Sequence, residues 1–168
     1  MTVATPPRPS HAAQDAPARE TVYLHPGHVV VRDTPAAVTT ILGSCVTVLL
    51  YDERRCVGGV NHFLLPHWAG TGVENARFGA AAMRQLISGV RALGGRTPDL
   101  RAKVFGGACV LEAFGRADGE HLGTRNVRVA LEALRAEGIP VLAEDTGGRR
   151  GRRLLLTTDD GAALVRLI

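Results

Sequence analysis

Residues 39–52 read TTILGSCVTVLLYD, and this stretch decides how the chain is organised. Apolar and β-branched runs lie on either side of a Gly-Ser pair, and such runs indicate buried strands. Because glycine and serine interrupt strands, Gly43 and Ser44 predict a tight turn between two of them. Further strands are predicted on both sides, at 21–25, 28–32 and 56–65.

Two helices are predicted after these strands. In residues 75–93, apolar side chains recur at three- and four-residue steps, and Asn75 is the expected capping residue. A second amphipathic run covers 125–137 and stops at Gly138. Short strand-like runs complete the chain, at 102–105, 141–144, 154–157 and 162–167. This mixture favours an α/β fold, a layered sandwich with a mixed β-sheet flanked by two or three helices.

The first twenty residues differ in composition from the rest of the chain. They contain four prolines among alanine, serine and charged residues, and such a segment buries too little apolar surface to offset chain entropy. We expect a disordered tail at 1–20 and a single domain at 21–168. No apolar run approaches the roughly 20 residues that span a bilayer, and no secretory signal precedes the domain, so we expect a cytoplasmic protein.

The spacing of the cysteines and the distribution of charged residues limit the classes of function that the chain can have. Three cysteines at irregular spacings, without a CxxC pair, argue against a disulfide framework. The arginine cluster at 149–153 lies among glycines, and aromatic residues make up only 4% of the chain, so nucleic-acid binding is disfavoured. His25 with His28, and His62 with His67, have spacings that could suit zinc, but turn positions explain them better. We expect neither a metal nor a cofactor.

One cysteine and one histidine form a candidate catalytic pair. Cys45 follows the Gly43-Ser44 turn, and His62 lies 17 residues later on the next predicted strand, so adjacent strands can bring the two face to face. A thiol attacks as the thiolate, and a neighbouring imidazole can take its proton to give a thiolate–imidazolium pair. The turn can also aim backbone N–H groups around Gly43 and Ser44 at one point, as an oxyanion hole requires. This pattern indicates a cysteine hydrolase.

The motifs around this pair resemble those of the CheD family, the chemoreceptor glutamine deamidases. The resemblance covers about residues 21–168, and the order and spacing of its six motifs make it specific. The motifs are LGSCVTVLLYD at 42–52, GGVNHFLLP at 58–66, ARFG at 76–79, AKVFGGA at 102–108, GTRN at 123–126 and DTGGRRGRR at 145–153. The fold that the resemblance implies is again a mixed α/β layered sandwich.

The resemblance also implies a Cys–His–Thr triad. Its nucleophile is Cys45 and its base is His62, and the third member, six residues before the cysteine, is Thr39. The hydroxyl of this threonine would orient the imidazole. Thr40 is the neighbouring alternative, and in a regular strand the two threonines point to opposite faces, with Thr39 on the side of Ile41. The spacing favours Thr39.

The implied activity is hydrolysis of glutamine side chains in the cytoplasmic domains of chemoreceptors, which yields glutamate and ammonia. The family also implies a CheC-type phosphatase as a partner, so a regulatory binding module is the alternative function. Phe105 in the FGGA motif is the candidate partner surface, with burial in the core as the competing interpretation. Asn126 either lies beside the substrate or caps the second helix.

Overall fold

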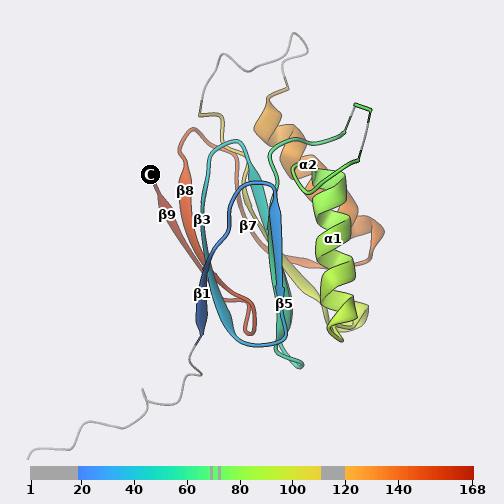
Figure 1. The fold of residues 1–168 in the computed structure, drawn as a ribbon. Helices are drawn as coiled ribbons and strands as arrows, with labels where there is room; N and C mark the ends of the chain where they lie inside the picture. Colours follow the sequence, from blue (N-terminus) through green and yellow to red (C-terminus); the bar gives the residue numbers. More distant parts are fainter. Residues whose placement is uncertain (1–18, 69, 72, 111–119) are drawn as a thin grey trace, which may run out of the picture.

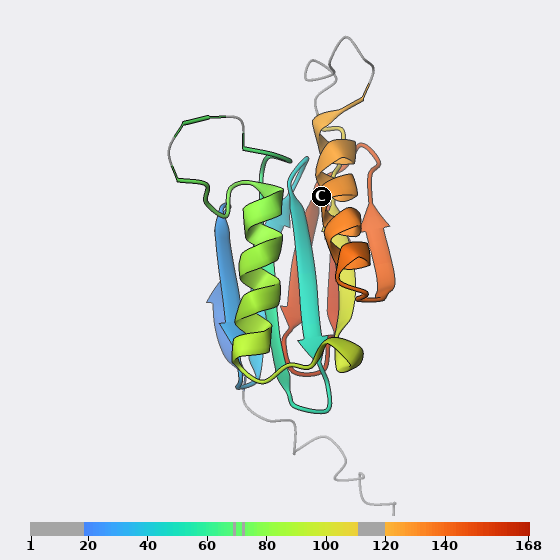
Figure 2. The same cartoon turned by 90° about the vertical axis from the view of Figure 1, so that its right-hand side faces the viewer.

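Two β-sheets packed face to face, with two helices on the outer side of one of them, make up the fold (Figures 1 and 2). The computed structural model describes residues 19–68, 70–71, 73–110 and 120–168. The layers are therefore sheet, sheet and helices. This arrangement confirms the predicted class of a layered α/β sandwich, and each of the two sheets is mixed.

The outer sheet, called sheet A here, has four strands in the order β1-β3-β8-β9. Strand β1 runs parallel to β3, and the other two pairs are antiparallel. The strands are β1 (Glu20–Tyr23), β3 (Ala36–Leu42), β8 (Arg152–Thr157) and β9 (Ala163–Leu167). The last two form the hairpin expected at the end of the chain.

The inner sheet, sheet B, has five strands in the order β2-β5-β4-β6-β7. Only β6 and β7 pair in parallel. The strands are β2 (His28–Arg32), β5 (Val57–His62), β4 (Val46–Asp52), β6 (Arg101–Gly106) and β7 (Val141–Thr146). Because sheet A covers one face of β4 and the helices cover the other, all seven of its residues are buried.

Helices α1 (Gly79–Ala92) and α2 (Leu122–Ala136) cover sheet B, and a short 3₁₀ helix, η1 (Thr97–Asp99), precedes β6. The prediction that Asn75 caps the first helix is wrong. Asn75 accepts a hydrogen bond from the Arg77 N–H in a turn before the helix, and Phe78 occupies the capping position without a side-chain bond. Helix α2 begins three residues earlier than expected, because the His121 side chain accepts the Gly123 N–H and caps it.

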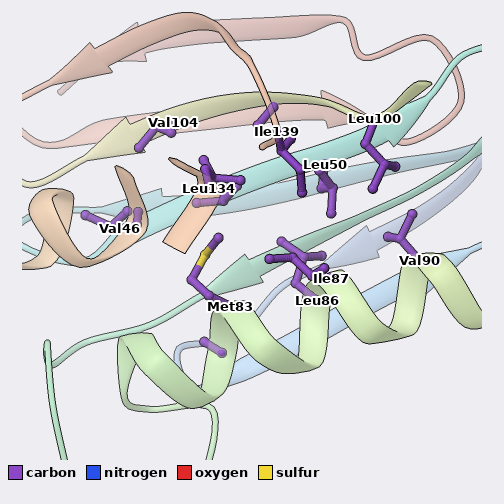
Figure 3. Close-up of a cluster of buried hydrophobic side chains, with 14 of the residues drawn as sticks. Val46, Leu50, Met83, Leu86, Ile87, Val90, Leu100, Val104, Leu134 and Ile139 are labelled. Atoms are coloured by element: carbon purple, nitrogen blue, oxygen red, sulfur yellow. The ribbon is translucent and has the colours of Figure 1, made fainter. Parts of the chain in front are cut away.

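Two apolar cores follow from this layering. One lies between the sheets and includes Val38, Leu42, Val60 and Leu154. The other lies between sheet B and the helices, where α1 extends a row of side chains toward the sheet (Figure 3). That row consists of Met83, Leu86, Ile87 and Val90. In the described part of the chain, no helix has the length and apolar character needed to cross a bilayer.

The first strand begins slightly earlier than predicted. Strand β1 begins at Glu20 rather than Thr21. Arg19 already has partners, because its guanidinium donates to the carboxylates of Asp159 and Asp160 in the turn between β8 and β9. The rest of the predicted tail, 1–18, lies outside the described residues.

Candidate active site

At one end of the sandwich the chain crosses between the two sheets three times, between β1 and β2, between β3 and β4, and between β7 and β8 (Figure 1). Backbone bonds fix the first two of these crossings to the end of β5. The Gly27 N–H donates to the His62 carbonyl at 2.7 Å, and Val46 and Phe63 exchange bonds of 3.1 and 3.0 Å. Cys45 directly precedes Val46, and His62 directly precedes Phe63. In this antiparallel arrangement the two residues lie on opposite sides of the Val46–Phe63 pair, so they are diagonal to each other on the same face of the sheet.

The His62 ring is held from one side by a threonine hydroxyl. The side chain is 1% exposed, and its Nδ1 lies 2.9 Å from Thr40 Oγ1. The same Oγ1 lies 2.9 Å from the Leu24 carbonyl oxygen, which can only accept. The Thr40 hydroxyl therefore donates its hydrogen bond to the Leu24 carbonyl, and its oxygen accepts a hydrogen bond from the N–H at His62 Nδ1. This chain of bonds selects the tautomer whose Nε2 carries a free lone pair.

Thr40, and not Thr39, contacts the imidazole. This corrects the expectation that the Thr39 hydroxyl orients the ring. Thr40 shares the inner face of β3 with Val38 and Leu42, between the sheets. Thr39 lies on the outer face, beside Arg153 and Leu155 of β8. The strand alternates as expected, but the spacing to Cys45 pointed to the wrong face. The apolar pair Val38 and Leu42 is the sequence signal that marks Thr40 as the inward threonine.

Burial keeps the imidazole neutral. The pKa of His62 is lowered to about 4, mainly by desolvation; the Leu24 carbonyl acts in the opposite direction, and the neighbouring His28 contributes to the lowering. Its Nε2 is buried and has no hydrogen-bond partner among the described residues. A neutral ring with a free Nε2 is the form that can accept a proton.

The thiol of Cys45 is also neutral. Cys45 is half-buried and free of disulfides, and burial raises the pKa of its thiol, with its own backbone N–H acting in the opposite direction. Because burial disfavours the charged form of both Cys45 and His62, the resting pair is thiol and imidazole. The preformed thiolate–imidazolium pair expected from the sequence is therefore disfavoured. The thiol proton therefore has to pass to the imidazole while Cys45 attacks a substrate.

Three consecutive backbone carbonyls in the turn before β4 accept hydrogen bonds from distant parts of the chain. The Gly43 carbonyl accepts the Ala108 N–H at 2.9 Å, and the Cys45 carbonyl accepts the Gly107 N–H at 2.8 Å. The Ser44 carbonyl accepts the side-chain amide of Asn126 at 3.0 Å. In a trans peptide the C=O and the following N–H point in opposite directions. The N–H groups of Ser44 and Cys45 therefore point away from these partners, and neither has a backbone acceptor within the described ranges.

Comparison with known proteins places the chain in a family. The family model described as "CheD chemotactic sensory transduction" matches residues 64–167. A protein of Anaeromyxobacter dehalogenans named "Probable chemoreceptor glutamine deamidase CheD 1" is 48% identical over 98% of this chain and 96% of its own length. The chain belongs to the CheD family. A Rhodospirillum rubrum protein named "Probable chemoreceptor glutamine deamidase CheD" is 47% identical over 87% of this chain and 81% of its own length.

Two solved structures resemble this CheD-family chain at low sequence identity. The crystal structure of Neisseria meningitidis protein NMB0706, of family DUF152, has a TM-score of 0.49 and 15% identity over 89% of this chain and 75% of that one. The Bacillus licheniformis hypothetical protein YfiH has a TM-score of 0.40 and 19% identity over 70% of this chain and 49% of that one.

The FGGA motif of this CheD-family chain supports the Cys45 turn and is not a partner surface. Phe105 is 3% exposed and packs in the core between the sheets, so its expected role as an exposed contact is wrong. Gly106 has a φ of +107°, and a Cβ there would clash with the Cys45 carbonyl oxygen. A Cβ at Gly107 would meet the Val127 side chain at 2.5 Å. Glycine at these positions lets β6 and α2 approach the turn closely.

Two of the other candidate residues lie near this site, because His28 pairs with His62 in register and Cys109 follows Ala108, whose N–H bonds to the Gly43 carbonyl. Among residues 19–68, 70–71, 73–110 and 120–168, no group of three or more His, Cys, Asp or Glu side chains is arranged to hold a metal ion. Cys56 is exposed, with a φ of 53° in the turn between β4 and β5, and Cys109 is half-buried. In this CheD-family chain, Cys45 is the cysteine that lies diagonally across the Val46–Phe63 bridge from His62.

The tautomer of His62 can be measured directly. In ¹⁵N-labelled protein at pH 7, two-bond ¹H–¹⁵N spectra are expected to show a protonated Nδ1 and an unprotonated Nε2. The valine in Thr40→Val cannot accept the Nδ1 proton, and it leaves buried polar groups unpaired at a cost of about 1–3 kcal/mol. This variant is therefore expected to show a mixture of tautomers.

Thr39→Val is the matched control, because Thr39 lies on the outer face of the same strand. Its His62 spectrum is expected to equal that of the unmodified protein. A mixture of tautomers in Thr39→Val, with none in Thr40→Val, would contradict the assignment of the orienting hydroxyl.

Proposed function

We propose that the protein is a chemoreceptor glutamine deamidase. It hydrolyses the side-chain carboxamide of specific glutamines in receptor cytoplasmic domains and releases ammonia. Support comes from the names of the relatives in the two bacteria and from the site itself. The observation that carries the proposal is the buried, neutral His62, whose Nε2 is free and whose strand adjoins the one that begins after Cys45.

In the first half-reaction, Cys45 Sγ attacks the carboxamide carbon while its proton passes to His62 Nε2. The negative charge that develops on the carboxamide oxygen is stabilised by the N–H groups of Ser44 and Cys45. The C–N bond then breaks as the imidazolium returns its proton to the leaving nitrogen. Since burial lowers the pKa of His62 to about 4, its imidazolium is a strong acid and expels ammonia rather than amide anion.

In the second half-reaction, the glutamyl thioester on Cys45 is hydrolysed. Water attacks the thioester carbon while His62 Nε2 takes one of its protons. The C–S bond breaks, the proton returns to sulfur, and a glutamate side chain leaves. Thr40 accepts a hydrogen bond from Nδ1–H throughout, so that Nε2 is the ring nitrogen that exchanges protons with the reactants in both half-reactions. No metal or redox step is needed in this scheme.

The reaction is tested with purified protein and the cytoplasmic fragment of a chemoreceptor from the same genome. Tryptic peptides are expected to show conversion of particular glutamines to glutamates by mass spectrometry, with an equal amount of ammonia released. The fragment incubated alone reports spontaneous deamidation. Asparagines in the same peptides serve as an internal control, because they are expected to change no faster with the protein than without it.

The alternative is a regulatory binding module that acts through a CheC-type phosphatase. This partner remains a prediction, and the burial of Phe105 removes the surface that the sequence offered for it. Receptor binding without any conversion of glutamine would overturn the deamidase proposal and favour the module.

A further inference from the structure

A buried asparagine ties the Cys45 turn to the helical layer. Asn126 lies in the second turn of α2 and is 0% exposed. Its Nδ2 donates to the Ser44 carbonyl at 3.0 Å and to the Leu64 carbonyl at 2.8 Å. One carbonyl directly precedes Cys45, and the other follows the end of the strand that carries His62. A single amide thus joins the two chain segments of the candidate site.

The orientation of this amide follows from its partners. Both carbonyl oxygens can only accept hydrogen bonds, so the NH₂ group of Asn126 must face them. The rotated amide would place Oδ1 against two oxygens. The Oδ1 atom is itself buried and has no partner within the described ranges. Burying an unpaired acceptor costs free energy, which the two hydrogen bonds donated by Nδ2 have to offset.

We propose that Asn126 is a positioning residue that aims the backbone N–H of Cys45 at the oxyanion. The inference rests on the proposed deamidase function. By fixing the direction of the Ser44 carbonyl, Asn126 fixes the opposite direction of the Cys45 N–H across the same trans peptide. Since a hydrogen-bond donor in an oxyanion hole must be aligned before charge develops, this fixed peptide plane contributes to the rate.

Of the three groups that donate to the carbonyls of the Cys45 turn, Asn126 is the side chain, and the other two are backbone N–H groups. The carbonyls of Gly43 and Cys45 accept hydrogen bonds from the backbone N–H groups of Ala108 and Gly107, which only a proline substitution would remove. The Ser44 carbonyl is held by the Asn126 amide. Substitution of Asn126 can therefore release the middle peptide while the peptides on both sides stay bonded.

The test compares two reactions of Cys45 in the intact protein. Deamidation of the receptor fragment develops an oxyanion, whereas alkylation by iodoacetamide only displaces iodide at a saturated carbon. Asn126→Ala is expected to lower kcat for deamidation by about 10²-fold with little change in KM, the usual effect of losing one oxyanion donor. The rate of Cys45 alkylation at pH 9, followed by peptide mass spectrometry, is expected to stay unchanged.

Control variants separate positioning from folding. Glu132→Ala changes an exposed position on the same helix and is expected to leave both rates unchanged. If Asn126→Ala does not fold, Asn126→Ser takes its place, because it keeps one donor and is expected to lose less of kcat. Unchanged kcat in Asn126→Ala, or a parallel fall in kcat and alkylation, would overturn the inference.

The outcome for Cys45 distinguishes this inference from the function on which it rests. If Cys45→Ala is inactive while Asn126→Ala is fully active, only the positioning role fails. If Cys45→Ala retains activity, the proposed thiol mechanism fails, whatever the Asn126 variants do.

Discussion

Cys45→Ala is expected to abolish ammonia release from a receptor fragment without unfolding the protein. The substitution removes the atom that forms the thioester, and loss of a nucleophile of this kind lowers kcat by at least about 10⁴-fold. The effect on the fold should be small, because Cys45 is half-buried and lies outside any disulfide. A destabilisation of about 1 kcal/mol is typical of a single substitution. Coupled ammonia detection and a thermal melt measure the two effects.

Cys109→Ala is the matched control for this experiment. Cys109 is also half-buried and free, and its N–H donates to the Gly148 carbonyl through backbone that alanine retains. We expect full activity in this variant. Full activity in Cys45→Ala, or its loss in Cys109→Ala alone, would show that the nucleophile has been assigned to the wrong cysteine.

His62→Gln is expected to have the second-largest effect, a fall in kcat of about 10²- to 10⁴-fold through loss of the general base. Glutamine fills most of the space of the ring and can still bond to Thr40, but it cannot carry a proton from Cys45 to the leaving nitrogen. Steady-state rates on the receptor fragment at pH 7 measure the loss. Retention of more than half of the activity would exclude His62 as the base.

The same substitution is expected to change how stability depends on pH. His62 has a pKa of about 4 in the folded protein and an ordinary value of 6.5 when exposed. Between these values the unfolded chain binds a proton that the folded protein does not, so stability is highest above pH 6.5 and falls as the pH drops toward 4. The loss attributable to His62 is about 3 kcal/mol over this window.

Urea unfolding of both proteins at pH 7 and at pH 4.5 isolates this contribution. All other groups titrate alike in the two proteins, so the difference between pH values should be smaller in His62→Gln by about 2–3 kcal/mol. An equal pH dependence in both proteins would show that the folded protein binds a proton at His62 as readily as the unfolded chain.

Local sequence determined most of the elements of this protein. Apolar runs with turn residues between them predicted the strands around Gly43, the final hairpin and both helices, because side-chain periodicity reflects which face is buried. The helix starts were less predictable. His121 and Phe78 occupy the capping positions, and capping depends on the path by which the chain approaches a helix. Cys45 and His62 were predicted as a pair, and the structure places them on opposite sides of the antiparallel Val46–Phe63 bridge.

Only the tertiary structure decided which groups surround that pair. The choice between Thr39 and Thr40 depends on which face of β3 meets sheet B, and Phe105 is buried because β6 turns it into the space between the sheets. Asn126 reaches Ser44 across 82 positions of sequence, a contact that no local pattern encodes. The neutral state of the Cys45 thiol follows from burial as well. Sequence fixes the chemical groups, whereas packing fixes their direction and charge, because both depend on contacts between distant segments.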